Sequence, residues 1–204
     1  MRKVTRTLAV LVAMLVPLAL TPTVNAAGEK VTANTKLTPQ NGPLYKKKRV
    51  PSRLFISASV NAPASSTTVT PTKRIKLTFP RGMSLKPNRK VCRDNKLNEN
   101  SALGNPKQVV NSCRGAVIGT GTAMIYLAQN KAAPLRDAVL IAFNAGKTGK
   151  GEPRLKIYGY SQSTTVGILM TSVLKGRVLN LHIPVLSFDS SVGTFRLGIP
   201  GSRL

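Results

Sequence analysis

Two cysteines, a single histidine and a large excess of cations are the residues of this chain that could do chemistry. Cys92 and Cys113 do not form a Cys-x-x-Cys pair, and one histidine cannot complete a zinc cage around them. In an exported protein, an even number of cysteines is expected to be oxidised. The sequence therefore predicts a structural disulfide between Cys92 and Cys113, and no metal or other cofactor.

His182 is the one candidate for a general base. Asp189 and several serines are near it in sequence, but a catalytic triad requires a nucleophile, a base and a carboxylate in contact. A lone histidine beside Asn180, on the polar face of a predicted strand, is typical of a surface residue. We therefore assign no catalytic residue and do not expect an enzyme; a hydrolase that uses His182 is kept as an alternative.

The charge of the chain is strongly positive, with 31 basic and 6 acidic side chains and a net charge of +25. Such a field attracts polyanions. The alternative interpretation is a solvated surface whose charge only keeps the protein soluble. The predicted anion-binding residues come from two basic runs and are Lys46, Lys47, Lys48, Arg49, Arg53, Lys73, Arg74 and Lys76.

The first 26 residues have the pattern of a signal peptide. Arg2, Lys3 and Arg6 precede an apolar stretch of about 13 residues, and Ala26 ends a small-residue cleavage motif. A stretch of that length is too short to span a bilayer. The sequence therefore predicts a secreted protein, whose mature chain begins at Ala27 and keeps a net charge of +22.

The mature chain is predicted to consist of a leader and one domain. Residues 27–48 are polar and show no periodicity, which indicates a flexible basic leader. Residues 49–204 are long enough to bury one hydrophobic core. We therefore expect a single β domain over 49–204.

Alternating apolar residues recur in short segments along this domain. They include Leu54, Ile56, Ala58 and Val60 in an early strand, Ile75, Leu77 and Phe79 after a loop rich in threonine and proline over residues 61–72, and a closing strand over residues 192–199. Residues 138–143 are apolar on both faces, which predicts a central, buried strand. About eight such strands with turn residues between them favour an antiparallel β-sandwich, immunoglobulin-like or jelly-roll-like.

Two local features interrupt this pattern. Between the cysteines, Asp94 or Asn95 is expected to begin a short helical segment that ends at Gly104-Asn105-Pro106. The glycines of residues 117–123 indicate a strand whose backbone is approached closely by a facing element.

Several short motifs occur in a fixed order: residues 76–82, Ser112-Cys113, the Val-Ile-Gly-Thr-Gly-Thr-Ala of residues 117–123, Ala142-Phe143-Asn144, residues 157–159 and residues 182–184. In this order they resemble a group of uncharacterised secreted proteins of Gram-positive soil bacteria, over about residues 52–199. The resemblance implies export, a β fold and a disulfide, and it carries no catalytic or binding residue. The chain departs from the group in its strong positive charge and in Ala145, where the group has glycine after Phe-Asn.

Two functions are compatible with these features. The first is a non-catalytic envelope or extracellular protein that adheres through its basic surface to anionic cell-wall polymer or acidic polysaccharide. The second is nucleic-acid binding, because phosphate backbones attract the same charge. Only Tyr45 and Phe55 lie near the basic runs as possible stacking residues, which favours the first function.

Overall fold

The computed structural model describes residues 28–40, 50–79, 81, 84–86, 89–98, 104–184 and 191–202. The predicted signal peptide lies outside the described residues. The elements in chain order are β1 (Lys30–Pro39), β2 (Ser52–Asn61), β3 (Arg74–Thr78), α1 (Pro106–Ser112), β4 (Val117–Tyr126), the 3-10 turn η1 (Leu127–Gln129), β5 (Pro134–Lys147), β6 (Pro153–Ser161), β7 (Val166–Lys175), β8 (Val178–His182) and β9 (Ser191–Ser202).

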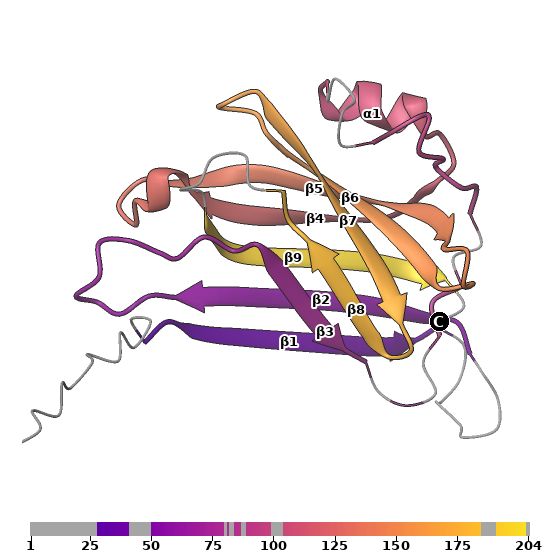
Figure 1. Cartoon of the computed structure of the whole chain (residues 1–204), viewed down its shortest axis with the longest axis horizontal. Helices are drawn as coiled ribbons and strands as arrows, with labels where there is room; N and C mark the ends of the chain where they lie inside the picture. Colours follow the sequence, from indigo (N-terminus) through magenta and orange to yellow (C-terminus); the bar gives the residue numbers. More distant parts are fainter. Residues whose placement is uncertain are drawn as a thin grey trace, which may run out of the picture.

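The nine strands form one antiparallel sheet in the order β1-β2-β9-β4-β5-β6-β7-β8-β3. The sheet curls into a half-barrel, so that β3, β8 and β7 cross in front of β1, β2 and β9 (Figure 1). The prediction of an all-β antiparallel fold is confirmed. The expected two-sheet sandwich of about eight strands is corrected to one curled sheet of nine, because the ladder of paired strands continues from β1 to β3 without a break.

The concave side of the sheet holds the larger core. It takes side chains from β2 through β9, among them Leu54, Leu140, Ile157, Leu181 and Leu197, each at most 2% exposed. Curling the sheet brings these faces together, and burial of this apolar surface is the main favourable term in folding. The strand predicted to be central, β5, is indeed the fifth of the nine.

The convex side of β5, β6 and β7 is covered by the segment that joins the two cysteines. Cys92 and Cys113 form the predicted disulfide, with 5.1 Å between their Cα atoms. With Leu97 and Val109 they pack onto outward-facing residues of the sheet such as Phe143. We call residues 92–113 the disulfide arc; its apolar side chains give the convex side a second core.

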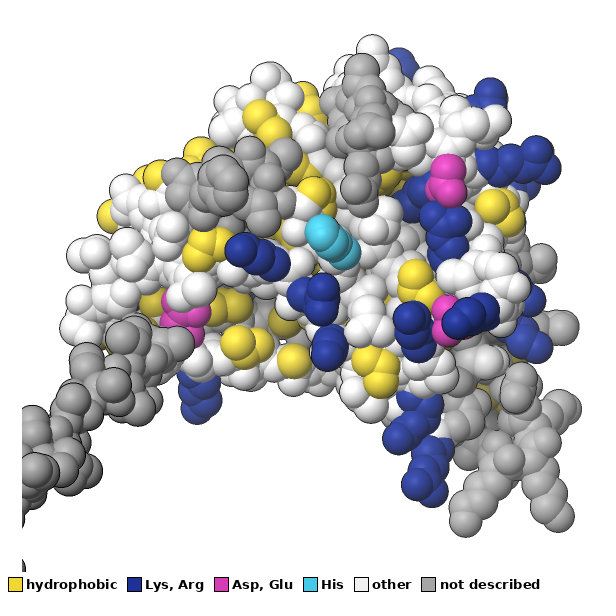
Figure 2. Space-filling model, viewed as in Figure 1, with side chains coloured by type: hydrophobic (Ala, Val, Ile, Leu, Met, Phe, Trp, Pro, Cys, Tyr) yellow, Lys and Arg dark blue, Asp and Glu magenta, His cyan; other side chains and the backbone are white. Residues whose placement is uncertain are grey.

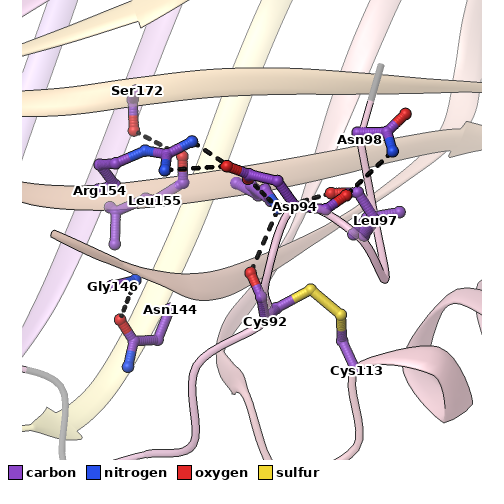
Figure 3. A network of polar contacts seen from close by, with 11 residues as sticks. Cys92, Asp94, Leu97, Asn98, Cys113, Asn144, Gly146, Arg154, Leu155 and Ser172 are labelled. Carbon is purple, nitrogen blue, oxygen red and sulfur yellow. Dashed lines mark hydrogen bonds and ion pairs between the residues drawn. A yellow bond between two sulfur atoms is a disulfide. The ribbon is translucent and has the colours of Figure 1, made fainter. Parts of the chain in front are cut away.

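A buried lysine fastens the disulfide arc to β6. The side chain of Lys156 is 1% exposed, and its Nζ donates to the carbonyl oxygens of Cys92 (3.2 Å) and Leu97 (2.5 Å). It also lies 2.7 Å from Asp94 Oδ1, while both guanidinium nitrogens of Arg154 donate to the same carboxylate at 3.1 Å (Figure 3). These bonds from Lys156 and Arg154 hold the pKa of Asp94 below its usual value of 3.8.

Two further residues join the sheet to the segment between β3 and β4. Asn144, in the Phe-Asn motif, donates from Nδ2 to the carbonyl of Arg89 (2.9 Å), and its backbone carbonyl accepts from the N–H of Cys92 (2.8 Å). The Tyr158 hydroxyl donates to the carbonyl of Gly104. Burial raises the pKa of Tyr158 to about 12.

The helix lies later in the disulfide arc than expected. Asn105 caps α1 by accepting from the N–H of Gln108, whose side chain accepts from the N–H of Asn105, and Pro106 follows at the first position. This is a capping box with proline at N1, which begins a helix. Gly104-Asn105-Pro106 therefore starts a helix; residues 99–103, over which the expected helix would end, lie outside the described part.

The glycine motif of β4 meets the backbone of β9. A Cβ on Gly121 would lie 1.9 Å from the carbonyl oxygen of Arg196, and one on Gly119 would lie 2.4 Å from that of Gly198. Neither approach leaves room for a side chain. The predicted close approach is confirmed, but the expected facing element is wrong: the approaching element is the neighbouring strand β9, which pairs with β4 in the same sheet.

The expectation of a flexible leader is wrong for residues 30–39, which form β1 and pair with β2 along its whole length. Most of the side chains of β1 are exposed, and Leu37 packs against the concave core. β1 is held chiefly by backbone hydrogen bonds, which explains why it has no apolar periodicity to find.

Candidate anion-binding site

The local sequence of β3 divides cations from apolar side chains. Ile75 and Leu77 pack in the concave core, while Arg74 and Lys76 are exposed. This alternation is that of a strand with one buried face, and the predicted strand is confirmed. The charges of β3 therefore lie on the convex, solvent side of the sheet.

β3 is an edge strand, and no other strand among the described residues pairs its second edge. The N–H of Ile183 donates to the carbonyl of Lys73, and the N–H of Phe79 donates to the carbonyl of Arg177. In an antiparallel ladder every second residue bonds to the partner strand. The backbone groups of Arg74, Lys76 and Thr78, at the positions between, therefore point away from β8.

A hollow of about 380 Å³ lies along this free edge. We call it the seam groove, because it separates β3 from the strands at the opposite end of the sheet order. Its lining comes from residues 70–76, from Val31 of β1, from Ala58 and Val60 of β2, and from Val192, Gly193 and Phe195 of β9, with Glu29 beside them. The groove thus has an apolar floor and three cations, Lys73, Arg74 and Lys76, along one wall.

None of the acidic side chains in the described part of the chain forms an ion pair with this wall. Glu29 accepts from the N–H of Thr70 at 2.6 Å. Asp137 accepts from the Ser163 N–H, which holds its pKa below the usual value, and Glu152 accepts from a threonine hydroxyl. Both ion pairs within the described residues belong to Asp94. Glu29 shares the groove with the cations of β3, but no carboxylate of the described residues forms an ion pair with Lys73, Arg74 or Lys76.

His182 is on β8, where it pairs with Arg74 of β3 on one side and with Thr171 of β7 on the other. It is exposed, and within the described part of the chain no carboxylate or serine bonds to its imidazole. Figure 2 shows the histidine, in cyan, in the middle of this face with Lys and Arg side chains near it. Asp189, considered above as its possible partner, lies outside the described residues.

Of the other predicted anion-binding residues, only Arg53 is among the described ones, and it lies away from the groove. Arg53 is exposed at the start of β2, opposite Thr38, five residues and so about 16 Å of strand from the groove residue Ala58. The run Lys46, Lys47, Lys48 and Arg49 lies outside the described residues. Lys73, Arg74 and Lys76 are thus the predicted residues that share one site.

The apolar floor was missed by the sequence analysis. Val192 and Phe195 were assigned to a closing strand and Val60 to an early one, but nothing in their spacing indicates that they meet β3. Residues 70–72 were assigned to a loop rich in threonine and proline. Only the alternation within β3 itself indicated an exposed basic face.

A second hollow, of about 350 Å³, lies at one end of the concave side. It is lined mainly by apolar side chains such as Ile125, Leu135, Ile168 and Ile183, and none of its lining residues is charged. It touches the seam groove at Thr72 and Val192, which line both. Its chemistry does not suit an anion.

The described residues contain no helix that is both long and apolar enough to cross a membrane. Within the same residues, no three His, Cys, Asp or Glu side chains cluster as metal ligands would. Comparisons of the chain with models of known protein families, with curated proteins and with solved structures found no match.

Proposed function

We propose that this is a secreted, non-catalytic protein that adheres to anionic cell-wall polymer or acidic polysaccharide through its basic surface. The observation that supports the proposal most is the face formed by β3. There, Arg74 and Lys76 are exposed beside Lys73, and both ion pairs of the described chain are made elsewhere, by Asp94. Unneutralised cations on one face attract a polyanion and orient it.

The geometry gives no comparable support to the two alternatives. Nucleic-acid binding without sequence preference uses aromatic side chains on which bases stack. Phe55 lies on β2 opposite Lys36, and it does not line the seam groove. A hydrolase would need a base held by a carboxylate, and no carboxylate among the described residues forms an ion pair with His182.

The test is a pair of charge reversals with equal change in net charge. Arg74→Glu/Lys76→Glu alters the face of β3, and Lys147→Glu/Lys150→Glu alters exposed residues at the β5–β6 connection. We expect the first pair to weaken sedimentation with purified bacterial cell walls and with polygalacturonate beads by about tenfold or more, and the second by about threefold or less. Adhesion of the unaltered protein should fall steeply as salt rises, because exposed charges are screened.

Equal losses in the two variants would show that net charge alone acts, without a site on β3. Binding that does not change with salt would contradict electrostatic adhesion altogether. A gel shift with single- and double-stranded DNA at physiological salt serves as the comparison. Tighter binding to DNA than to either wall polymer would favour the nucleic-acid alternative.

A further inference from the structure

The free edge of β3 presents more than charge. The N–H and C=O groups of Arg74, Lys76 and Thr78 point away from β8 and toward the seam groove, as the bonds at Lys73 and Phe79 require. An unpaired row of backbone groups is a template for another extended chain. The groove beside it, at about 380 Å³, is a space in which such a chain can lie.

The side chains around this edge specify which extended chain fits. A residue directly opposite Arg74 or Lys76 in a new ladder would place its side chain on the convex face, beside those cations. The residues between would point the other way, toward Val60, Val192 and Phe195 in the groove. The complementary strand therefore alternates acidic and apolar residues over about five positions, the length of β3.

We infer that the free edge of β3 binds an extended acidic peptide by strand addition, with its acidic side chains over Arg74 and Lys76 and its apolar side chains in the seam groove. Backbone hydrogen bonds supply affinity in this mode of recognition, and alternate side chains supply specificity. This goes beyond adhesion to a polymer, which requires only charge.

The same edge discriminates against a second copy of this chain. Positively charged residues on an edge strand oppose pairing with a like edge. In such a pair, Arg74 and Lys76 of one copy would lie opposite the same basic residues of the other copy, on a protein whose net charge is +25. An acidic strand meets attraction at the positions where a second copy meets repulsion.

The probe is a labelled heptapeptide of alternating Glu and Val, measured by fluorescence anisotropy against the purified full chain at physiological salt. The protein variants are Lys76→Pro and Lys76→Ala. Both remove the same charge, but only proline removes the N–H that points into the groove. Proline is tolerated on an edge strand where its missing N–H faces away from the sheet.

We expect Lys76→Ala to weaken peptide binding by about threefold and Lys76→Pro by about tenfold beyond that, because the edge loses a hydrogen-bond donor and the straight path of the added strand. Polygalacturonate binding should be equal in the two variants. Equal peptide binding by Lys76→Pro and Lys76→Ala would overturn strand addition while leaving polymer adhesion intact. Loss of polymer adhesion with retained peptide binding would overturn polymer adhesion and leave strand addition intact.

A second arm does not depend on the folding of the proline variant. The same heptapeptide with the backbone nitrogens of its Glu residues methylated keeps its charge and side chains but cannot complete the ladder, because those residues lie opposite Arg74 and Lys76. Binding to the unaltered protein should fall at least tenfold relative to the unmethylated peptide. Equal affinities for the two peptides would refute the inference.

Discussion

Arg154 and Lys76 lie in one cross-strand row on the convex face, which runs from Arg154 on β6 through Val173 and Asn180 to Lys76 on β3. Their surroundings differ. Arg154 makes a two-bond contact with Asp94, which the disulfide arc places above the sheet. Lys76, three strands away, has no ion pair among the described residues.

This difference shows that basic side chains have different roles at the two ends of the convex face. Beneath the disulfide arc, cations are bonded to a carboxylate and to carbonyls, and they help to close the fold. At the seam groove, cations flank an unpaired strand edge and have no such bonds to any residue that the structure describes. Charge that is satisfied internally contributes to stability, while charge left free is available to a partner.

The strongest way to break this comparison is to release the disulfide arc. Cys92→Ala/Cys113→Ala opens a loop whose ends are 21 residues apart, and we expect the free energy of unfolding to fall by about 3 kcal/mol. Urea unfolding measures the loss. If the two ends of the surface are independent, peptide and polymer binding of the folded variant stay within about twofold of the unaltered protein. A large loss of binding would show that the arc also shapes the seam groove.

Removing the buried cation should have the next largest effect. Lys156→Met keeps much of the side-chain volume but leaves the carbonyls of Cys92 and Leu97 without their donor, so we expect a loss of about 2 kcal/mol in the free energy of unfolding. Lys150→Met, at an exposed turn, is the control and should change stability by about 0.5 kcal/mol or less. Equal effects would mean that burial of Lys156 contributes nothing.

The smallest effect is expected from the carboxylate itself. The pKa of Asp94 in the folded protein is below 3.8. The contribution of its carboxylate to stability is therefore fully present above that value and is lost as the pH falls through the lower folded pKa. Asp94→Asn should cost less than about 1 kcal/mol at pH 7, because the side chain is 58% exposed and water screens its pairs. The difference in urea midpoint between this variant and the unaltered protein should shrink as the pH falls below 3.8 and through the lower folded pKa of Asp94. A constant difference at all pH values would show that packing, and not charge, causes it.

The sequence allowed prediction of those parts of the fold in which one face of an element is buried. The alternation of Ile75 and Leu77 with Lys76 predicted β3, and the apolar run of residues 138–143 predicted a central strand. β1 was not predicted because it pairs with β2 through backbone groups, which leave no pattern in the side chains. The helix was misplaced because Gly104-Asn105-Pro106 was interpreted as a stop, although Asn followed by Pro and then Gln108 is also a start signal.

The candidate site divides in the same way. The basic run identified Lys73, Arg74 and Lys76, because charge is visible residue by residue. The apolar floor was not visible, since Val60 and Phe195 reach it only after the sheet has curled. Lys156 was equally hidden: in sequence it is one more cation between two apolar residues, and only the docked arc makes it buried.

That burial also gives the molecule a built-in reporter. An amine-reactive reagent such as acetic anhydride modifies exposed lysines within seconds, but Lys156, at 1% exposure and bonded to three acceptors, is shielded while the fold is intact. Mass-spectrometric footprinting of this single amine would therefore count the molecules that have opened at any moment, against the many other lysines of the chain as an internal standard.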